Sequence, residues 1–140
     1  MKGLDKIDEM IINMLEQNSR MSNTDIAQKL NISESAVRRR ISKLVNTGTI
    51  RKFTIEIDDS NMARAITWIS INPAVPTSDV STRIKNVKGV ETVYEIAGQF
   101  DIAGVIKGSN IAEINKTVED IRRIPGVINT NTSMVLRTIR

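Results

Sequence analysis

The spacing of apolar residues changes near Gly48, and this change limits the chain to a small set of folds. Before Gly48, apolar residues recur every three or four positions, as in Ile7, Met10 and Ile11, which is the spacing of one helix face. After Gly48, several segments are rich in β-branched residues and roughly alternate, as in residues 65–71, which is typical of strands. The 140 residues therefore predict an α+β protein with a helical first part and a sheet-containing second part.

Three short helices are predicted before Gly48, and each has a polar residue that can cap its first turn. These N-cap residues are Asp5, Ser22 and Ser33. Asn31, between the second and third helices, tolerates the left-handed conformation of a tight turn. The third helix is expected to run to about residue 47 and to end at Gly48, because glycine is common just after a helix.

The third helix contains the sequence SAVRRRISKL, residues 35–44, with three consecutive arginines. Successive helical residues rotate by about 100°, so the arginines cannot share one face. The buried face is predicted to hold Val37, Ile41 and Leu44. The opposite face is predicted to hold Ser35, Arg38, Arg39, Ser42 and Lys43. Arg40 falls at the edge of the apolar stripe, and we expect it to bridge to an acidic residue of the first helix.

A basic face on an isolated helix is usually a solvated surface, but the surroundings of this helix favour DNA binding. A short helix, a tight turn and a basic helix are typical of a helix-turn-helix, whose second helix enters the major groove. Arginine suits that position because its planar fork can pair with guanine O6/N7 or grip phosphate. The segment IRKFTIEI, residues 50–57, is expected to follow as the strand of a wing. The candidate DNA-binding residues are Ser33, Ser35, Arg38, Arg39, Ser42, Lys43, Arg51 and Lys52.

The distribution of charge agrees with a first part that binds a polyanion. The net charge is +4; residues 1–52 hold ten Lys/Arg against six Asp/Glu, whereas residues 53–140 hold ten of each. The absence of cysteine and histidine argues against disulfides, thiol nucleophiles and Cys/His zinc sites, so no metal or cofactor is expected. Because no signal peptide and no apolar run near ~20 residues is found, we expect a soluble, cytoplasmic protein without a membrane partner.

The second part is predicted to follow the order β-α-β-β-α-β. Two segments, IKNVKGV at 84–90 and IRRIPGV at 121–127, share the pattern Ile-x-x-apolar-x-Gly-Val, and both mark a helix end that turns through glycine into a strand. A four-stranded antiparallel sheet with both helices on one face follows, which is the ferredoxin-like arrangement. The expected strands are 65–71, 90–97, 101–108 and about 127–138, and the expected helices are 79–87 and 110–124.

The sequence resembles, over nearly its whole length, the Lrp/AsnC family of leucine-responsive and asparagine-responsive transcription regulators of bacteria and archaea. LDKIDEMIINMLEQNSR and IAQKLNISESAVRRRISKLVNTGTI resemble the family's opening helix and helix-turn-helix. IAGQFDIAGVIKG resembles the Gly-x-Tyr-Asp turn of its ligand-sensing module, and RIPGVINTNTSMVL resembles its closing strand. The expected domains are a winged helix-turn-helix at 1–52, a strand and linker at 53–63, and a ferredoxin-like amino-acid-sensing and oligomerisation domain at 64–140.

The resemblance implies dimers that often assemble into octamers, with amino acids bound between the sensing domains of neighbouring dimers so that assembly or DNA affinity changes. Phe100 departs from the family pattern because it replaces the usual tyrosine of the turn. Trp68, in the strand AITWISI, has no assigned place in the pocket or the dimer core. We expect an obligate homodimer on pseudo-palindromic double-stranded DNA, with this strand offering apolar area and backbone edges for pairing between protomers.

The turn GQFD, residues 98–101, is the candidate site for a small amino-acid effector. The backbone N–H groups of Gly98 and Gln99 could hold an α-carboxylate, and Asp101 could meet an α-ammonium group. Polar partners on the closing strand would complete the site across a subunit interface. The alternative is a plain hairpin turn in which Asp101 accepts hydrogen bonds from nearby backbone amides. The candidate effector-binding residues are Gly98, Gln99, Phe100, Asp101, Thr130, Thr132 and Ser133.

Two other functions are compatible with parts of the sequence. Ferredoxin-like folds also host enzymes, but the carboxylate pairs Asp58/Asp59 and Glu119/Asp120 are each adjacent in sequence and lie in a connector or on a helix surface. No Gly-rich phosphate loop, nucleophile elbow or metal-ligand cluster occurs, so we do not expect an enzyme. An architectural DNA-binding protein without an effector would share the first domain and differ only in whether the sensing site is occupied.

Overall fold

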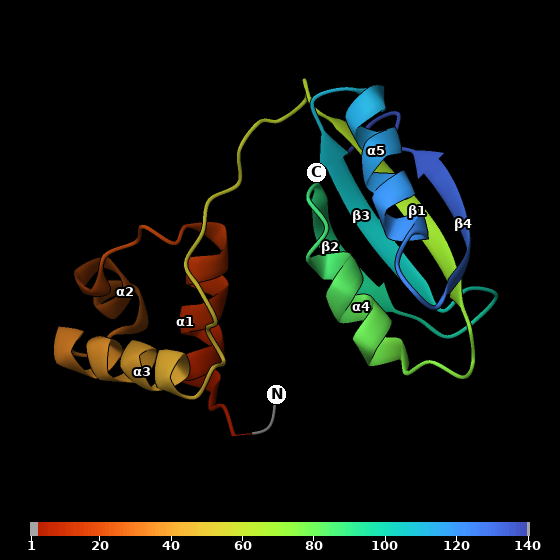
Figure 1. Cartoon of the computed structure of the whole chain (residues 1–140). Helices are drawn as coiled ribbons and strands as arrows, with labels where there is room; N and C mark the ends of the chain where they lie inside the picture. The colour runs from red at the N-terminus through yellow and green to blue at the C-terminus, as the bar shows by residue number, and fades with distance from the viewer. Residues whose placement is uncertain (1–2, 140) are drawn as a thin grey trace. The chain divides into compact units, whose positions relative to one another are not determined.

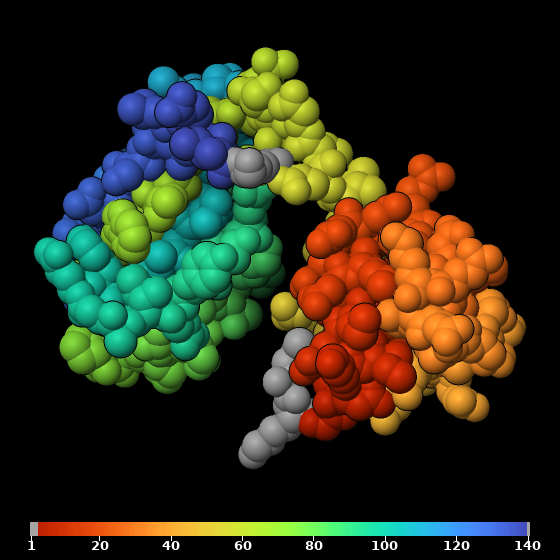
Figure 2. Space-filling model, turned by 180° about the vertical axis from the view of Figure 1, so that it is seen from behind, coloured from red at the N-terminus to blue at the C-terminus, as the bar shows by residue number. Residues whose placement is uncertain are grey.

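The computed structural model describes residues 3–139, which divide after Ile57 into two compact units. Figure 1 shows the helical first unit in red and orange and the sheet-containing second unit in green and blue. Figure 2 shows that the side chains of each unit pack closely together. The α+β class predicted from the change in apolar spacing is confirmed, and each unit is described below by itself.

The first unit is built from three helices, α1 (Lys6–Gln17), α2 (Asn23–Leu30) and α3 (Glu34–Asn46). The side chains of the predicted N-cap residues accept hydrogen bonds from backbone N–H groups of the first turns; these residues are Asp5, Ser22 and Ser33. Asn31 adopts the left-handed conformation with φ of 54°, as predicted for the turn between α2 and α3. The helices bury a small core that includes Ile11, Leu15, Ile26, Ala27, Val37 and Leu44.

The expected wing strand at residues 50–57 is wrong. No strand is assigned to residues 51–57, and most of the large apolar side chains of this segment are exposed. Ile50 still belongs to the helical unit, because its N–H donates to the carbonyl of Leu44 at 2.9 Å. Alternation alone does not make a strand, because a strand requires a hydrogen-bonding partner. In Figure 1 the segment runs as an extended yellow chain after α3.

The second unit contains four strands and two helices in the predicted order. They are β1 (Ala63–Ile71), α4 (Thr77–Lys85), β2 (Val90–Glu95), β3 (Ile102–Gly108), α5 (Ile111–Arg122) and β4 (Val127–Met134). The strands form one antiparallel sheet in the order β2-β3-β1-β4. Both helices cover the same face of this sheet (Figure 1). The ferredoxin-like arrangement is therefore confirmed.

Some predicted boundaries in the second unit are wrong by a few residues. The first helix begins at Thr77, directly after Pro76, instead of at residue 79. Proline at this point has a φ of −58°, which suits the residue before a helix. The last strand ends at Met134 instead of near residue 138, although the Val135 N–H still donates to the Arg64 carbonyl of β1 at 2.9 Å.

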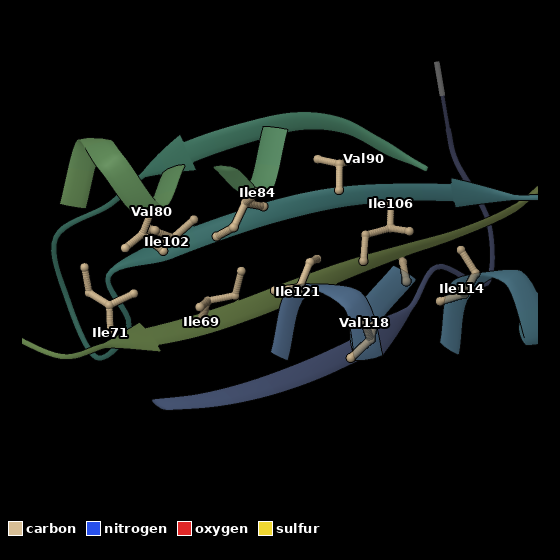
Figure 3. Packing of buried hydrophobic residues seen from close by; sticks show 11 residues of the cluster. Ile69, Ile71, Val80, Ile84, Val90, Ile102, Ile106, Ile114, Val118 and Ile121 are labelled. Carbon is tan, nitrogen blue, oxygen red and sulfur yellow. The ribbon is translucent and has the colours of Figure 1, made fainter. Parts of the chain in front are cut away.

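The core of the second unit lies between the sheet and its two helices. Figure 3 shows Ile69 and Ile71 of β1 and Ile102 and Ile106 of β3 directed toward the residues of α4 and α5. The helices contribute Val80, Ile84, Ile114, Val118 and Ile121. Alternation along β1 places Ala65, Thr67, Ile69 and Ile71 on this face, and each is buried. Neither α4 nor α5 covers the other face of the sheet (Figure 1).

The two copies of the internal repeat adopt the same conformation. Gly89 and Gly126 have φ values of +93° and +98°, so each turns the chain from a helix into a strand through a conformation that other residues rarely adopt. At Gly89, an added Cβ would also come within 2.6 Å of the Thr117 hydroxyl oxygen. The predicted repeat therefore marks two equivalent helix-to-strand turns.

The chain enters the second unit through a cluster of ion pairs. Asp59 Oδ2 lies 2.6 Å from Arg64 Nη2 of β1 and 2.7 Å from Lys107 Nζ of β3. Arg64 also contacts Glu91 of β2 at 3.2 Å. The hydrogen bond from Lys107, together with Arg64, holds the pKa of Asp59 below its ordinary value. The chain is thus attached to β1 and β3 at the point where the second unit begins, and Arg64 links this cluster to β2.

Candidate functional site

The exposed face of α3 carries the predicted DNA-binding residues of the helix. Val37 and Leu44 are buried against α1 and α2, and Ile41 is half-buried. On the opposite side, the side chains are exposed: Ser35, Arg38, Arg39, Ser42 and Lys43. The orientation of the helix predicted from its rotation per residue is therefore confirmed.

The crossing of α2 and α3 has the geometry of a helix-turn-helix. Ile32 donates its N–H to the Ala27 carbonyl at 3.1 Å, which closes the turn around the left-handed Asn31. Ser33 then starts α3 by accepting the Ala36 N–H at 3.1 Å, and its hydroxyl also lies 3.2 Å from that of Ser35. Both serines are exposed at the start of α3, where a groove-binding helix contacts DNA.

Arg40 is half-buried and bridges to carboxylates of the first helix and its cap, as its position at the edge of the apolar stripe predicted. Its Nη1 donates to Asp5 Oδ2 at 2.6 Å and to Asp8 Oδ1 at 2.8 Å. Asp8 is buried, with 4% of its surface exposed. The Asp8 backbone N–H and the Arg40 guanidinium together hold the pKa of Asp5 below its ordinary value, and the carboxylates raise the pKa of Arg40. The third arginine therefore holds α3 against α1.

Arg38 and Arg39 are both exposed, but their surroundings differ. Arg38 Nη2 donates to Glu34 Oε2 at 2.7 Å, one helical turn earlier. Arg39 forms no ion pair with any residue between 3 and 139. The three consecutive arginines thus have three environments: one paired on the surface, one free and one held to α1.

The basic pair after α3, Arg51 and Lys52, is exposed but does not lie on a wing strand. The segment stays close to the helical unit, since the Ser19 hydroxyl contacts the Thr54 carbonyl at 3.4 Å. Arg51 directly follows Ile50, which is bonded to the end of α3. The two charges are therefore near the C-terminal end of α3, and their predicted contact with the DNA backbone stays a prediction.

The predicted sensing turn joins β2 to β3 and is tied to β1. The Asp101 N–H donates to the Ile69 carbonyl at 3.0 Å, and its carbonyl accepts the Ile96 N–H at 2.9 Å. Asp101 Oδ2 accepts the Ile71 N–H at 2.9 Å. The alternative, in which Asp101 accepts hydrogen bonds from backbone amides, therefore holds for Oδ2. It leaves Oδ1 to be assigned. Asp101 is half-buried and lies directly before the start of β3.

The tip of this turn is open. Gly98 and Gln99 are exposed, and among residues 3–139 neither of their backbone N–H groups donates a hydrogen bond. Phe100 packs against Trp68 of β1, with 6.1 Å between the ring centroids and 34° between the ring planes. The sequence analysis assigned no place to Trp68; alternation along β1 puts it on the sheet face that lacks helices.

The candidate residues of the closing strand are not brought together. Thr130 and Thr132 lie on the helix-covered face, where Thr130 accepts a hydrogen bond from Arg122 Nε at 2.8 Å and Thr132 donates to the Thr67 hydroxyl at 3.1 Å. Ser133 pairs with Ile66 and therefore lies on the opposite face. Ile69 separates Thr130 from Ile102, the residue after the turn. Within one chain, β1 stands between the turn and these hydroxyls.

Comparison with known proteins agrees with both halves of this description. A family model described as winged helix-turn-helix DNA-binding matches residues 4–51, and one described as the Lrp/AsnC ligand binding domain matches residues 64–140. The HTH-type transcriptional regulator LysM of Sulfurisphaera tokodaii is 46% identical over 137 residues, which are 98% of this chain and 98% of that relative. The chain belongs to the Lrp/AsnC family of transcription regulators. It is therefore a DNA-binding regulator and not an enzyme.

Two solved structures share the fold over nearly the full length of the chain. The structure titled PH0061 superimposes with a TM-score of 0.88 at 28% identity, covering 100% of this chain and 97% of that one. The L-Met complex of the regulator NMB0573 from Neisseria meningitidis gives a TM-score of 0.86 at 22% identity, covering 98% and 92%. This likeness to the second structure extends to the fold alone.

The uncovered sheet face of this Lrp/AsnC regulator gathers three of its four aromatic residues, which sequence reasoning did not group. Trp68 and Tyr94 both pair with Ala103, one from β1 and one from β2, so they lie on either side of this small residue. Phe100 adds to the cluster through Trp68. Alternation in the three strands is the sequence signal that could have placed them together.

The described residues contain neither a metal-binding group nor a membrane-spanning helix. No group of three or more carboxylate side chains lies close enough to hold a metal ion in the range 3–139. No helix in that range is long and apolar enough to cross a membrane.

Proposed function

We propose that this regulator reads specific DNA sequences through α3 and that a small amino acid bound near residues 98–101 changes its assembly or its DNA affinity. The observation that carries the first part is the separation of the two faces of α3. The apolar side of α3 packs in the core of the helical unit. The basic and hydroxyl side chains on the other side are exposed and can contact a DNA groove. A major groove about 12 Å wide admits one such helix.

Several basic residues of α3 would contribute to DNA binding. Arg38, Arg39 and Lys43 can pair with phosphate or with guanine, and Ser35 and Ser42 can contact either base edges or phosphates. Arg51 and Lys52 would contact the backbone beside the groove. Because bacterial and archaeal DNA lies in the cytoplasm, we propose that the regulator acts there.

The second part of the proposal rests on the open turn. The N–H groups of Gly98 and Gln99 have no acceptor within residues 3–139, and two such groups can hold a carboxylate. Asp101 Oδ1 is available beside them, because the hydrogen bond from Ile71 goes to Oδ2. A fold relative from Neisseria meningitidis was solved with L-Met. The chemistry of the turn suits the α-carboxylate and α-ammonium groups that all amino acids share.

We further propose that the effector site is completed by another subunit. The hydroxyls of Thr130 and Thr132 are separated from the turn by β1 and are already hydrogen-bonded. A polar side chain of the effector would therefore need partners from a second chain, in a dimer or in a larger assembly such as an octamer. The aromatic face of the sheet offers the apolar area for a homodimer, which would place two α3 helices on a pseudo-palindromic site.

Two measurements test this proposal. Duplexes selected from random sequence by the purified protein should converge on a pseudo-palindrome, and footprints should show two half-sites about one helical turn apart. Thermal unfolding should then be recorded with each natural amino acid, since a ligand that binds only the folded protein raises the melting temperature. If selection succeeds and no amino acid changes either melting or DNA affinity, the architectural alternative is correct.

A further inference from the structure

Glu34 is the first residue of α3, and its carboxylate lies on the side of the helix that carries the DNA-binding candidates. Glu34 Oε2 accepts a hydrogen bond from Arg38 Nη2 at 2.7 Å, and the two side chains remain 40% and 62% exposed. An exposed pair four residues apart adds little to stability. The pair itself therefore adds little, and the stabilising role of Glu34 comes from its place in the first turn of α3, where a carboxylate favours the helix N-terminus without needing Arg38.

A negative charge beside the recognition face is unfavourable for general DNA binding. Every phosphate repels it, so Glu34 lowers the affinity of α3 for DNA of any sequence. Among the three arginines, only Arg38 is both exposed and held by a carboxylate of the same helix; Arg39 has no such partner between residues 3 and 139, and Arg40 is held to α1. The pair thus distinguishes Arg38 from its neighbours.

The geometry of the pair leaves most of the guanidinium available. Arginine has five N–H donors, and Glu34 engages one of those on Nη2. The second N–H of Nη2 stays free, and with the adjacent N–H of Nη1 or Nε it can form the two parallel bonds that a guanine edge accepts. A guanidinium that is held on one side has less freedom to turn toward a phosphate.

We propose that Glu34 is a positioning residue for base readout: it orients Arg38 toward a guanine and discourages the same side chain from binding phosphate. The inference rests on the proposed placement of α3 in the major groove. Arg39, which no carboxylate holds, serves as a phosphate contact. Glu34 thereby lowers the affinity for DNA of random sequence and increases the discrimination at one base pair.

The first test compares affinities for two duplexes, the sequence selected from a random pool and the same sequence changed at one base pair. Arg38→Ala identifies that base pair, because losing a bidentate contact reduces discrimination there by about 5- to 150-fold. Glu34→Gln keeps the size of the side chain and removes its charge. We expect it to strengthen binding to unrelated duplexes and to reduce discrimination at the same base pair by about fivefold or more.

A matched control separates positioning from a general charge effect. Asp25 lies in the first turn of α2, as Glu34 lies in the first turn of α3, and it forms no ion pair with any residue between 3 and 139. Asp25→Asn makes the same change in net charge. We expect it to alter the affinity for all duplexes alike and to leave discrimination unchanged. Equal melting temperatures would show that all variants are folded.

The deciding measurement is a double-mutant cycle. If Glu34 acts through Arg38, adding Glu34→Gln to Arg38→Ala causes no further loss of discrimination. A loss that persists without Arg38 would mean that Glu34 contacts a base itself, and unchanged discrimination in Glu34→Gln would reduce the pair to a surface contact; either result overturns the inference. If the native protein shows no sequence preference, the proposed placement of α3 in the major groove is wrong, and the inference about Glu34 is wrong as well.

Discussion

The guanidinium of Arg40 on α3 lies 2.8 Å from the carboxylate of Asp8 on α1, and Asp8 is almost completely removed from solvent. A buried carboxylate without a cationic partner is strongly destabilising. We therefore expect Arg40→Ala to lower the free energy of unfolding by about 1–3 kcal/mol, measured by urea denaturation. Arg39→Ala is the control, and its exposed position predicts a change within about 0.5 kcal/mol. Equal effects of the two variants would contradict the structural role of Arg40.

The pKa of Asp5 predicts a contribution to acid unfolding. Its folded pKa lies below the ordinary value of 3.8, so between the two values the unfolded chain binds more protons than the folded one. The stability from Asp5 is therefore fully present above its ordinary pKa and is lost as the pH falls through the folded value. Asp5→Asn keeps a capping side chain without this titration. We expect its free energy of unfolding to fall less steeply than that of the native protein below about pH 4.

The free guanidinium of Arg39 predicts a uniform effect on DNA binding. As a phosphate contact, Arg39→Ala should weaken binding to selected and unrelated duplexes by the same factor. The dependence of the logarithm of affinity on the logarithm of salt concentration should become shallower by about one unit. Fluorescence anisotropy across a salt series measures both quantities. A loss confined to one base pair would instead assign Arg39 to base reading.

The two roles of Asp101 can be separated by substitution. Asp101→Asn keeps an oxygen that can accept the Ile71 N–H but removes the charge offered to an α-ammonium group. We expect this variant to retain the native melting temperature and DNA affinity and to lose at least about tenfold in amino-acid affinity, as a charged partner to a hydrogen bond is lost. Calorimetric titration with the responsive amino acid measures this loss. Native amino-acid affinity in the variant would remove the turn from the effector site.

The position of Trp68, the one tryptophan of the sequence, predicts that its fluorescence reports dimer formation. Dilution below the dissociation constant should shift its emission to the red as the aromatic face meets water. Trp68→Ala should weaken the dimer by about 2 kcal/mol or more, the range of a central aromatic contact. Ile111→Ala, which removes an exposed apolar side chain from α5, should leave sedimentation unchanged. A dimer that is insensitive to Trp68→Ala would place the interface elsewhere.

Sequence reasoning succeeded where each residue's environment follows from a fixed period. The rotation of α3 was enough to bury Val37, expose Arg39 and direct Arg40 toward α1. It failed where a neighbouring strand was needed. Residues 50–57 alternate as a strand does, but the sequence does not say which segment would form hydrogen bonds with them. It also grouped Thr132 with Ser133, although the alternation of a strand places adjacent residues on opposite faces.

The attachments of Ile50 and Asp59 limit how far a recognition helix can travel from the sheet. Ile50 is bonded to Leu44 at the end of α3, and Asp59 is held by Arg64 and Lys107. The nine peptide steps between them span at most about 30 Å when fully extended, at ~3.3–3.6 Å per residue. In a dimer, this greatest length applies to the connection of each of the two recognition helices. The length of the connection, and not the chemistry of α3, then sets the greatest spacing of two half-sites that one dimer can occupy at once.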